Sequence, residues 1–403
     1  MPAAIVYAAV FTTAAAIYWI MNRHKPLRHI LSELKHTIDM QGAGAGGMID
    51  DLVNIRRNKV VLPDATRKVA VITGGAKGIG TEVIRGLLKA NMRVVMGIRN
   101  PEQAKKLSET MENGENLQAF QLDLKSLKSV KEFAQKVMEL YPEVNLLVNN
   151  AGIMFGDYEI TEDGLESQLA VNHLGHFYLT HLLLPALKKA GAIEGPSRIV
   201  NVTSCAHYPG KVYFEDINMK EHYDTTAAYA QAKLAQLMSA RYINSMLEED
   251  GCPVRGYAVH PGIVNTDLFE KTLFRRVFPW AMKLFFKSPS RGAISILFTC
   301  FDKDLDKKGG LYISNCIEGI SSKFSKNVDY QKRLFQISCK LVGIDEKNPF
   351  FFNLECPGSV EMMSGTSSSL DAADPSEHSD KLDTVLENEP PSFPRKHKTH
   401  PSP

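Results

Sequence analysis

Residues 68–80 read Lys-Val-Ala-Val-Ile-Thr-Gly-Gly-Ala-Lys-Gly-Ile-Gly. The apolar first half is typical of a strand that is buried on both faces of a parallel sheet. Gly74, Gly78 and Gly80 then allow a tight turn, a close approach of backbone to a pyrophosphate, and close packing of the next helix. A helical pattern follows at once, and the free N–H groups at a helix N-terminus favour phosphate. This order predicts a dinucleotide-binding turn.

Six further apolar runs resemble the first in length and composition. They lie at residues 92–98, 117–123, 144–152, 197–204, 254–262 and 309–315. Helical patterns separate them, for example at Thr81–Ala90, Leu127–Tyr141, Leu165–Lys189 and Ala228–Glu249. Because strands that alternate with helices form parallel βαβ units, the sequence predicts an α/β fold. We expect a doubly wound parallel sheet of the Rossmann type, as one catalytic domain over residues 67–356.

Composition excludes several classes of protein. The 403 residues carry 47 Lys and Arg against 45 Asp and Glu, a formal net charge of +2. A nucleic-acid binder needs a basic face, so no nucleic-acid partner is expected. The six cysteines form no CxxC pair, which argues against a zinc framework or a secreted disulfide scaffold. Histidines near the motifs lack acidic ligands at metal spacing, so no metal site is expected.

The two ends of the chain differ from the middle. Residues 2–21 carry no charge and are largely apolar, which is long enough for a membrane anchor over residues 1–21. Basic residues follow the run rather than precede it, so the catalytic domain is expected to face the cytosol. A surface helix or a mitochondrial presequence is the alternative. Residues 22–66 read as a polar connector, with a short helix at Leu27–Ile38 and a flexible run at Gln41–Gly47. Residues 357–403 are Ser-, Pro- and acid-rich and are expected to be disordered.

The second predicted strand bears on the cofactor. It ends in Arg99, where an acidic residue would bind the ribose 2′-hydroxyl of NAD(H) and a basic residue suits a 2′-phosphate. Lys77, in the glycine turn, adds a second positive charge. NADP(H) is therefore the preferred cofactor, and NAD(H) stays possible.

A family resemblance appears at Tyr229-Ala-Gln-Ala-Lys233. Together with the glycine turn, Asn149-Asn-Ala-Gly152 and Pro261-Gly262, this motif resembles the short-chain dehydrogenase/reductases over residues 67–345. The stretches Asn172–Phe177 and Val202–His207 are similar to the membrane-anchored retinol dehydrogenase group. That resemblance implies oxidation or reduction of lipid alcohols, aldehydes and ketones with a nicotinamide cofactor.

Proton transfer can be assigned from residue chemistry. A free tyrosine, with a pKa of about 10, is a poor base near neutrality. Lys233 lies one helical turn after Tyr229, so its charge is expected to favour the tyrosinate and lower that pKa. We assign Tyr229 as general acid/base and Lys233 as its electrostatic partner and ribose anchor. Ser204, at the end of a strand, is expected to orient the substrate oxygen.

The resemblance implies further roles. Asn172 is expected to hold a water that links Lys233 to solvent, Asp123 to contact the adenine, and Thr266 to meet the nicotinamide carboxamide. Asn149 and Gly152 are expected to border the cofactor. The full predicted cofactor-binding set is Thr73, Gly74, Lys77, Gly78, Ile79, Gly80, Arg99, Asp123, Asn150, Ala151, Gly152, Tyr229, Lys233, Pro261, Gly262 and Thr266.

The segment Leu268–Lys287 interleaves aromatic and aliphatic residues with Lys and Arg. The family resemblance makes it a substrate-covering lid, which could receive a lipophilic alcohol from a bilayer; a core-closing helix pair or a dimer interface is the alternative. We expect a membrane-bound oxidoreductase whose substrates are retinoids or other isoprenoids, and steroids are the next candidate class. The endoplasmic reticulum is the expected membrane, mitochondria the rival, and a homodimer is plausible. A non-catalytic, cofactor-binding scaffold is the alternative from another class.

Overall fold

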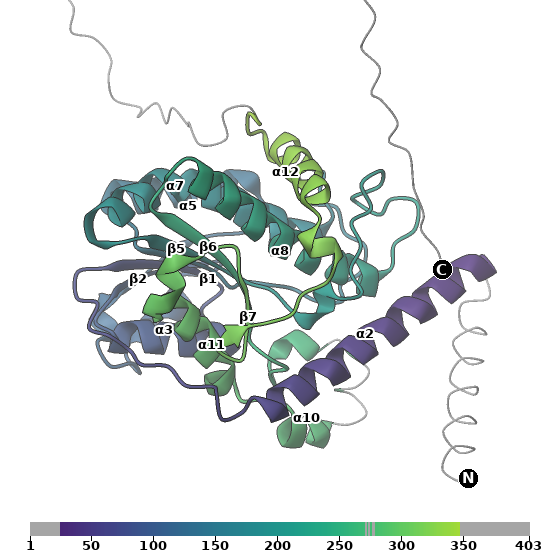
Figure 1. Cartoon of the computed structure of the whole chain (residues 1–403), viewed down its shortest axis with the longest axis horizontal. Helices are drawn as coiled ribbons and strands as arrows, with labels where there is room; N and C mark the ends of the chain where they lie inside the picture. The colour runs from purple at the N-terminus through teal and green to yellow at the C-terminus, as the bar shows by residue number, and fades with distance from the viewer. Residues whose placement is uncertain (1–24, 271, 273–274, 276–278, 347–403) are drawn as a thin grey trace, which may run out of the picture. The chain divides into compact units, whose positions relative to one another are not determined.

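The computed structural model describes residues 25–270, 272, 275 and 279–346 (Figure 1). Its centre is an eight-stranded sheet in the order β3-β2-β1-β4-β5-β6-β7-β8. All neighbouring strands of this sheet are parallel except β7 and β8. The strands are β1 (Val69–Thr73), β2 (Arg93–Ile98), β3 (Leu117–Gln121), β4 (Leu146–Asn149), β5 (Ser197–Val202), β6 (Val254–His260), β7 (Tyr312–Ser314) and β8 (Ile317–Glu318). The predicted doubly wound α/β fold is confirmed.

Helices cover both faces of the sheet. The α-helices are α2 (Leu27–Val53), α3 (Gly78–Lys89), α4 (Glu102–Ser108), α5 (Leu127–Leu140), α6 (Ser167–Leu169), α7 (Gly175–Glu194), α8 (Thr225–Glu249), α10 (Pro279–Phe285), α11 (Pro289–Phe301) and α12 (Val328–Val342). Short 3₁₀ turns lie at Gly114–Asn116, Cys205–His207, Asp267–Phe269, Lys303–Lys307 and Phe324–Lys326, and a π-helical turn at Ala170–Leu174. Helices α5, α7 and α8 pack on one face, with α12 against α8, and α3 and α11 pack on the other (Figure 1).

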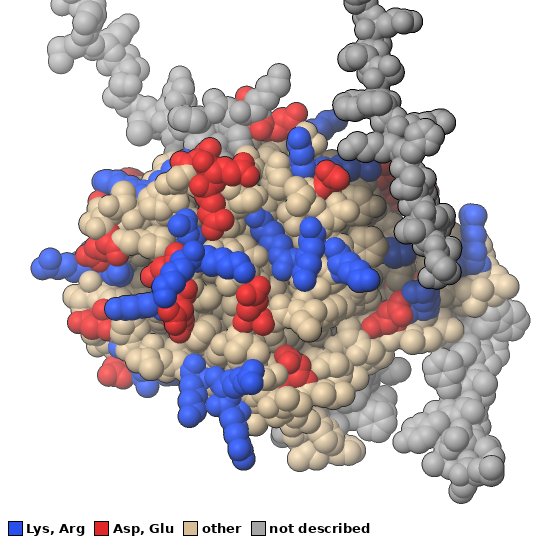
Figure 2. Space-filling model, viewed as in Figure 1, with Lys and Arg blue, Asp and Glu red and all other residues tan. Residues whose placement is uncertain are grey.

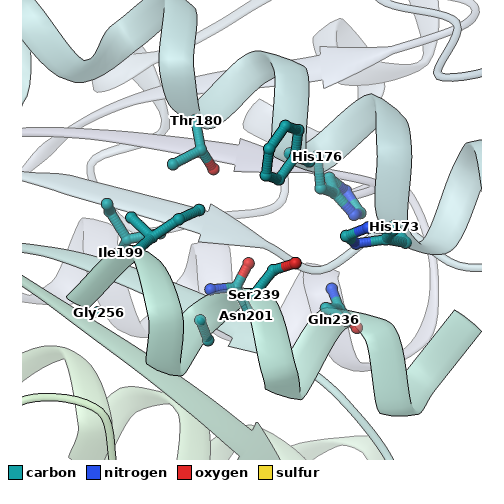
Figure 3. A pocket seen from close by; sticks show the side chains of 11 residues that line it. His173, His176, Thr180, Ile199, Asn201, Gln236, Ser239 and Gly256 are labelled. Atoms are coloured by element: carbon teal, nitrogen blue, oxygen red, sulfur yellow. The ribbon is translucent and has the colours of Figure 1, made fainter. Parts of the chain in front are cut away.

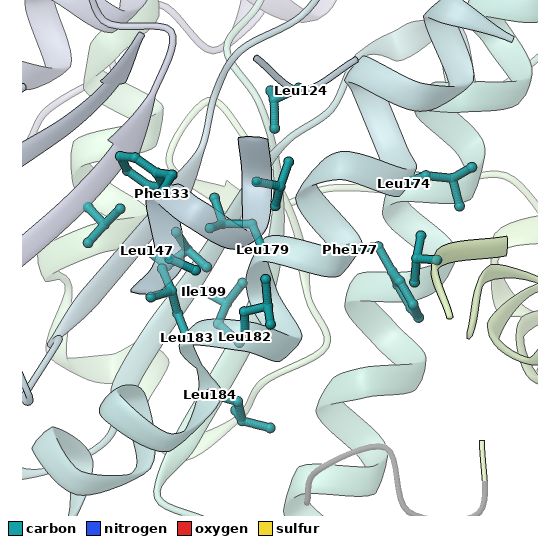
Figure 4. Packing of buried hydrophobic residues seen from close by; sticks show 14 of the residues in the cluster. Leu124, Phe133, Leu147, Leu174, Phe177, Leu179, Leu182, Leu183, Leu184 and Ile199 are labelled. Carbon is teal, nitrogen blue, oxygen red and sulfur yellow. The ribbon is translucent and has the colours of Figure 1, made fainter. Parts of the chain in front are cut away.

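Each face has its own apolar core. On the α7 face, leucines of that helix pack against Phe133 of α5, Leu147 of β4 and Ile199 of β5 (Figure 4). On the opposite face, Ile84 and Leu87 of α3 pack with Ile296 of α11. Strands β1 and β4 are buried along their whole length, which is why they appear in the sequence as continuous apolar runs rather than alternating ones.

The strand order reverses between β1 and β4. In open parallel sheets, ligands bind in the crevice outside the carboxyl ends of the strands at such a switch point. The parallel register of β1 with β2 and β4, and of β5 with β6, brings these carboxyl ends to one edge of the sheet. The residues that follow β1, β4, β5 and β6 therefore meet in space although they are distant in the sequence.

Helix α2 departs from the expectation for the connector. A short helix and a flexible run were expected, whereas a single helix of 27 residues continues through Gln41–Gly47 to Val53. Each glycine inside a helix costs about 1 kcal/mol relative to alanine. The helix is held by tertiary contacts instead, since it lies against α8 and the turn Cys205–His207, and such contacts override local propensity.

The predicted anchor, residues 1–21, and the predicted tail, residues 357–403, lie outside the described residues, so the boundaries at both ends stay predictions. Within the described part of the chain, no helix combines the length and the apolar character that crossing a bilayer requires. On the face shown in Figure 2, basic and acidic side chains are interspersed, in keeping with the small net charge.

Candidate active site

The glycine turn is shaped for a ligand that approaches the backbone closely. Gly74 and Gly78 have positive φ angles of 70° and 61°, which other residues rarely adopt. A Cβ on Gly74 would lie 2.8 Å from the Cα of Ala151, and a Cβ on Gly80 would lie 2.3 Å from the carbonyl oxygen of Gly74. Helix α3 starts at Gly78 without a side-chain cap, so its first N–H groups point into the turn. These residues fit a dinucleotide pyrophosphate.

The Asn-Ala-Gly stretch after β4 holds this turn in place. The Thr73 hydroxyl accepts hydrogen bonds from the N–H groups of Asn150 and Ala151, each at 3.0 Å. In return, Asn150 Nδ2 donates to the carbonyls of Thr73 and Gly74, each at 2.9 Å. The Asn149 side chain is fully buried and donates to Thr180 and Asn201. The Asn149 side chain therefore connects β4 to α7 and β5 in the interior, and its expected place beside the cofactor stays a prediction.

The basic residues proposed for a 2′-phosphate are exposed at the same edge. Arg99 follows β2, and Lys77 lies within the glycine turn. The Lys77 ammonium lies 3.7 Å from Asp267 Oδ2. A Cβ on Gly78 would lie 3.2 Å from Thr266 Cγ2, which brings the loop after β6 against the glycine turn. Asp123 is half-buried, and its carboxylate accepts the Lys125 N–H at 3.0 Å.

Ser204 and Tyr229 meet where β5 ends beside α8. Ser204 caps the turn Cys205–His207 by accepting the Ala206 N–H at 3.2 Å. Tyr229 is 4% exposed. Burial raises the pKa of Tyr229 well above its usual value near 10, and a hydrogen bond with Ser204 lowers it in part. Tyr229 is therefore protonated at neutral pH and can give a proton to an oxygen placed beside Ser204.

The Lys233 ammonium lies one turn further along α8 and is also buried. It donates to the carbonyl of Val202 at 2.8 Å and to Gln236 Oε1 at 3.1 Å. Burial lowers the pKa of Lys233 to about 7. The expected net lowering of the Tyr229 pKa is wrong for this conformation, because burial of the tyrosine outweighs the attraction between a tyrosinate and the Lys233 ammonium, which is bound to the Val202 carbonyl and Gln236.

Asn172 lies in the π-helical turn and faces the same place. Its side chain donates to the carbonyl of Ile153 and accepts the Ile153 N–H, each at 2.9 Å. A Cβ on Gly152 would lie 3.0 Å from Asn172 Oδ1 and 3.7 Å from Lys233 Nζ. The structure thus brings Gly152, Asn172 and Lys233 together. The amide bonds the backbone N–H and carbonyl of Ile153, so it fixes the loop after β4.

A small cavity lies between α7, α8 and the strands β5 and β6 (Figure 3). His173, His176, Gln236 and Ser239 are grouped around it, and it has room for about one water molecule. Gln236 Nε2 and Ser239 Oγ are buried and have no protein partner among the described residues. A water in this cavity would bond Ser239 and Gln236, and Gln236 also accepts a hydrogen bond from the Lys233 ammonium.

An apolar cluster covers Tyr229. Met154 and Ala206 pack with the tyrosine, and further side chains surround them: Met40, Phe155, Leu268 and Phe269. The Phe155 ring meets the Tyr229 ring edge-on, with centroids 5.8 Å apart. Phe155 has a φ of 58°, a strained value for an aromatic residue, and its N–H donates to Gln168 Oε1 at 2.9 Å. Leu268 and Phe269 come from the predicted lid, part of which lies outside the described residues.

Two charged residues of the site were not found from the sequence. Asp51 Oδ1, on α2, forms a buried ion pair with Lys287 Nζ at 2.8 Å. Asp51 Oδ2 accepts the Ile263 N–H at 2.8 Å, and a Cβ on Gly262 would lie 2.7 Å from both charged groups. The pair therefore supports the Pro261-Gly262 turn from behind. Nothing in the local sequence around Asp51 signals this contact, because the partners are brought together only by the fold.

Comparisons with known proteins identify the family of the chain. The family model described as short chain dehydrogenase matches residues 68–275. Polyprenol dehydrogenase of Danio rerio is 38% identical over 290 residues, covering 70% of this chain and 89% of the relative. Retinol dehydrogenase 11 of Homo sapiens is 36% identical over 281 residues, covering 69% and 86%. A solved structure of an uncharacterized protein from Mycobacterium paratuberculosis has 30% identity and a TM-score of 0.59, covering 70% of this chain and 96% of that one.

Proposed function

We propose that the chain interconverts a long apolar alcohol and its aldehyde or ketone. The chain belongs to the short-chain dehydrogenase/reductase family, whose members are NAD(P)-dependent oxidoreductases of alcohols and carbonyls. One observation carries the proposal. Tyr229, Ser204 and Lys233 converge under an apolar cluster at the edge of the sheet beside the glycine turn. Such a site excludes water around a reacting oxygen.

Each residue has a distinct role in the proposed reaction. When bound, NAD(P)H supplies the hydride for carbonyl reduction, and NAD(P)⁺ takes it up in alcohol oxidation. Tyr229 gives a proton to the substrate oxygen, or takes it in the reverse direction. Ser204 donates a hydrogen bond that orients this oxygen. Lys233 stabilises the tyrosinate electrostatically and anchors the ribose, while Asn172 holds the loop that brings Gly152 beside Lys233. Asn172 is also proposed to hold the water that links Lys233 to solvent.

NADP(H) is the proposed cofactor. Arg99 and Lys77 are exposed near the carboxyl end of β2 and the glycine turn, where the 2′-phosphate of NADP(H) would lie. Arg99 directly follows the last residue of β2, the position at which an acid would favour NAD(H). A preference for NAD(H) on the same chemistry is the alternative.

The proposed substrate is a retinoid or another isoprenoid alcohol. Support comes from the apolar cluster over Tyr229 and from similarity to proteins named polyprenol and retinol dehydrogenases. Exposed apolar side chains on α10, Trp280, Leu284 and Phe285, suit contact with a bilayer. The apolar run at residues 2–21 would anchor the chain, with the domain in the cytosol at the endoplasmic reticulum, mitochondria being the alternative; a homodimer is compatible.

Turnover by the full chain in detergent micelles tests the proposal. Retinal, a polyprenal and a steroid ketone would each be offered with NADPH and with NADH. We expect NADPH turnover of an isoprenoid aldehyde, and Tyr229→Phe should lower kcat by about 10² to 10⁴-fold without changing the affinity for NADPH. Tyr330→Phe, at a 40% exposed tyrosine on α12, is the matched control and should be unchanged.

Two results would contradict parts of this proposal. NADPH binding without turnover of any carbonyl would favour the non-catalytic scaffold. The cofactor assignment has its own variant, because Arg99→Ala should raise the KM for NADPH by about tenfold or more through loss of a charge-assisted hydrogen bond. If Arg99→Ala leaves the ratio of NADPH to NADH efficiency unchanged, the proposed phosphate contact is wrong while the catalytic assignment stands.

A further inference from the structure

Helix α2 is attached to the catalytic helix near its N-terminal half. His36 Nδ1 bonds Asp224 Oδ2 at 2.9 Å, and His36 Nε2 lies 3.3 Å from the Tyr213 hydroxyl. Asp224 caps α8 by accepting the N–H groups of Thr226 and Ala227. Because α8 carries Tyr229, the position of α2 is tied to the element that places the general acid.

The other end of α2 is attached to the cofactor side. Near its C-terminus, Asp51 pairs with Lys287 and accepts the Ile263 N–H. Gly47 packs so closely that a Cβ there would lie 3.3 Å from Cys205 Sγ and 3.4 Å from Ile263 Cδ1. Polar and close contacts on both sides therefore hold the middle of the helix against the turn that follows Ser204.

Met40 lies between these attachments. It is the one side chain of α2 that packs in the described cluster around Tyr229. The turn of α2 that carries Met40 cannot move away from the site unless the His36 contact or the Asp51 contact breaks. A substrate group that enters this cluster therefore meets Met40. A methionine side chain is unbranched and adapts its shape to a neighbour.

We propose that α2 forms one wall of the substrate site and that Met40 is a specificity-determining residue, setting the width of the space over Tyr229. This inference rests on the proposed function and deepens it. An apolar wall of this kind discriminates by size, since one methylene in a hydrophobic pocket changes the relative efficiency by about 10- to 200-fold. A large side chain at position 40 should exclude bulky substrates, and a small one should admit them.

Two variants of the full chain test the proposal with retinal and with decanal, each reduced by NADPH in micelles. Met40→Trp should raise the KM for the bulky retinal about tenfold or more and leave decanal and NADPH within about twofold. Met40→Ala should shift the ratio of the two efficiencies toward retinal. The control is Leu31→Ala, which removes a 57% exposed side chain from the same helix and should change neither ratio. If Met40→Trp does not fold, Met40→Ala still decides.

Retinol binding, measured by its fluorescence, separates the two proposals. If both Met40 variants keep the KM values, the efficiencies and the retinol Kd of the unmodified chain, the proposed role of Met40 is wrong and the proposed reaction is unaffected. A retinol Kd that the Met40 variants shift, in a protein that reduces neither aldehyde, supports the wall and overturns the proposed reaction. Neither retinol binding nor turnover in the unmodified chain overturns both.

Discussion

Tyr229 keeps its proton at neutral pH because burial raises its pKa above 10, while burial of Lys233 lowers the lysine pKa to about 7. The two groups therefore titrate in a different order from free side chains. Carbonyl reduction needs a protonated Tyr229 and benefits from a charged Lys233, which stabilises the tyrosinate that forms. The lysine, rather than the tyrosine, should then control the rate near neutrality.

We expect kcat/KM for carbonyl reduction to be flat below pH 7 and to fall above it, with an apparent pKa of about 7. The sign follows from the lowered pKa, since Lys233 loses its positive charge as the pH rises through that value. Tyr229 should add no titration below pH 10. Initial rates over pH 6 to 9 measure this profile. Lys233→Arg stays charged over that range, so its lower activity should not fall with pH; the same decline in that variant would mean that another group titrates.

Among the elements, the strands were the most predictable. Seven apolar runs between turn signals became β1 to β7, because a strand buried on both faces needs apolar residues at every position. The motif residues Gly74 and Ser204 meet at one edge of the sheet because a parallel sheet brings the carboxyl ends of its strands together, and α8 brings Tyr229 beside Ser204. The two-residue β8 is antiparallel and too short to leave a pattern.

The contribution of α2 to the site could not be predicted. Met40 and Tyr229 are distant in the sequence, and no local motif links them. Asp51 looks like one of many surface acids until Lys287 is placed beside it. The strained backbone of Phe155 depends on its bond to Gln168. These features arise from tertiary contacts, and tertiary contacts do not leave a periodic signal along the chain.

The buried pair between α2 and the chain after α10 has a measurable consequence. Lys287→Met should lower the free energy of unfolding by about 3 to 5 kcal/mol, because it leaves the buried Asp51 carboxylate without its partner. Urea unfolding measures the change. The double variant Asp51→Leu with Lys287→Met should be less destabilised than Lys287→Met alone. Lys307→Met breaks an exposed pair with Asp304 and should leave stability unchanged; an equal effect of the two lysine variants would mean that the Asp51 pair is also solvated.

At the scale of the whole molecule, five histidines are buried around the site and its core. Burial lowers their pKa values to about 3 or 4, and the residues are His173, His176, His181, His207 and His260. Each is neutral in the folded chain at pH 6, whereas an unfolded histidine binds a proton near pH 6.5. Burial raises the pKa of Glu166, so its effect on the pH dependence of stability has the opposite sign, but it is a single group and the histidines are five.

The fold should therefore be acid-labile. Because the unfolded chain binds more protons below pH 6.5, the stability from these neutral histidines is complete above that pH and is lost as the pH falls toward 4. Each group contributes up to about 1.4 kcal/mol per pH unit, so five together can remove most of a typical stability of about 5 to 15 kcal/mol within two units. We expect unfolding at pH values near 5, well above the range in which carboxylates alone would cause it.

Urea midpoints at pH 7.5, 6.5 and 5.5 test this expectation, with His260→Leu as the variant. Both ring nitrogens of His260 lack a protein partner among the described residues, so leucine should remove the titration with little loss of contacts. The midpoint should fall steeply below pH 6.5 in the unmodified chain and less steeply in His260→Leu. A midpoint that is the same at pH 7.5 and 5.5 would mean that these histidines reach solvent, and the closed packing around Tyr229 would then have to open in solution.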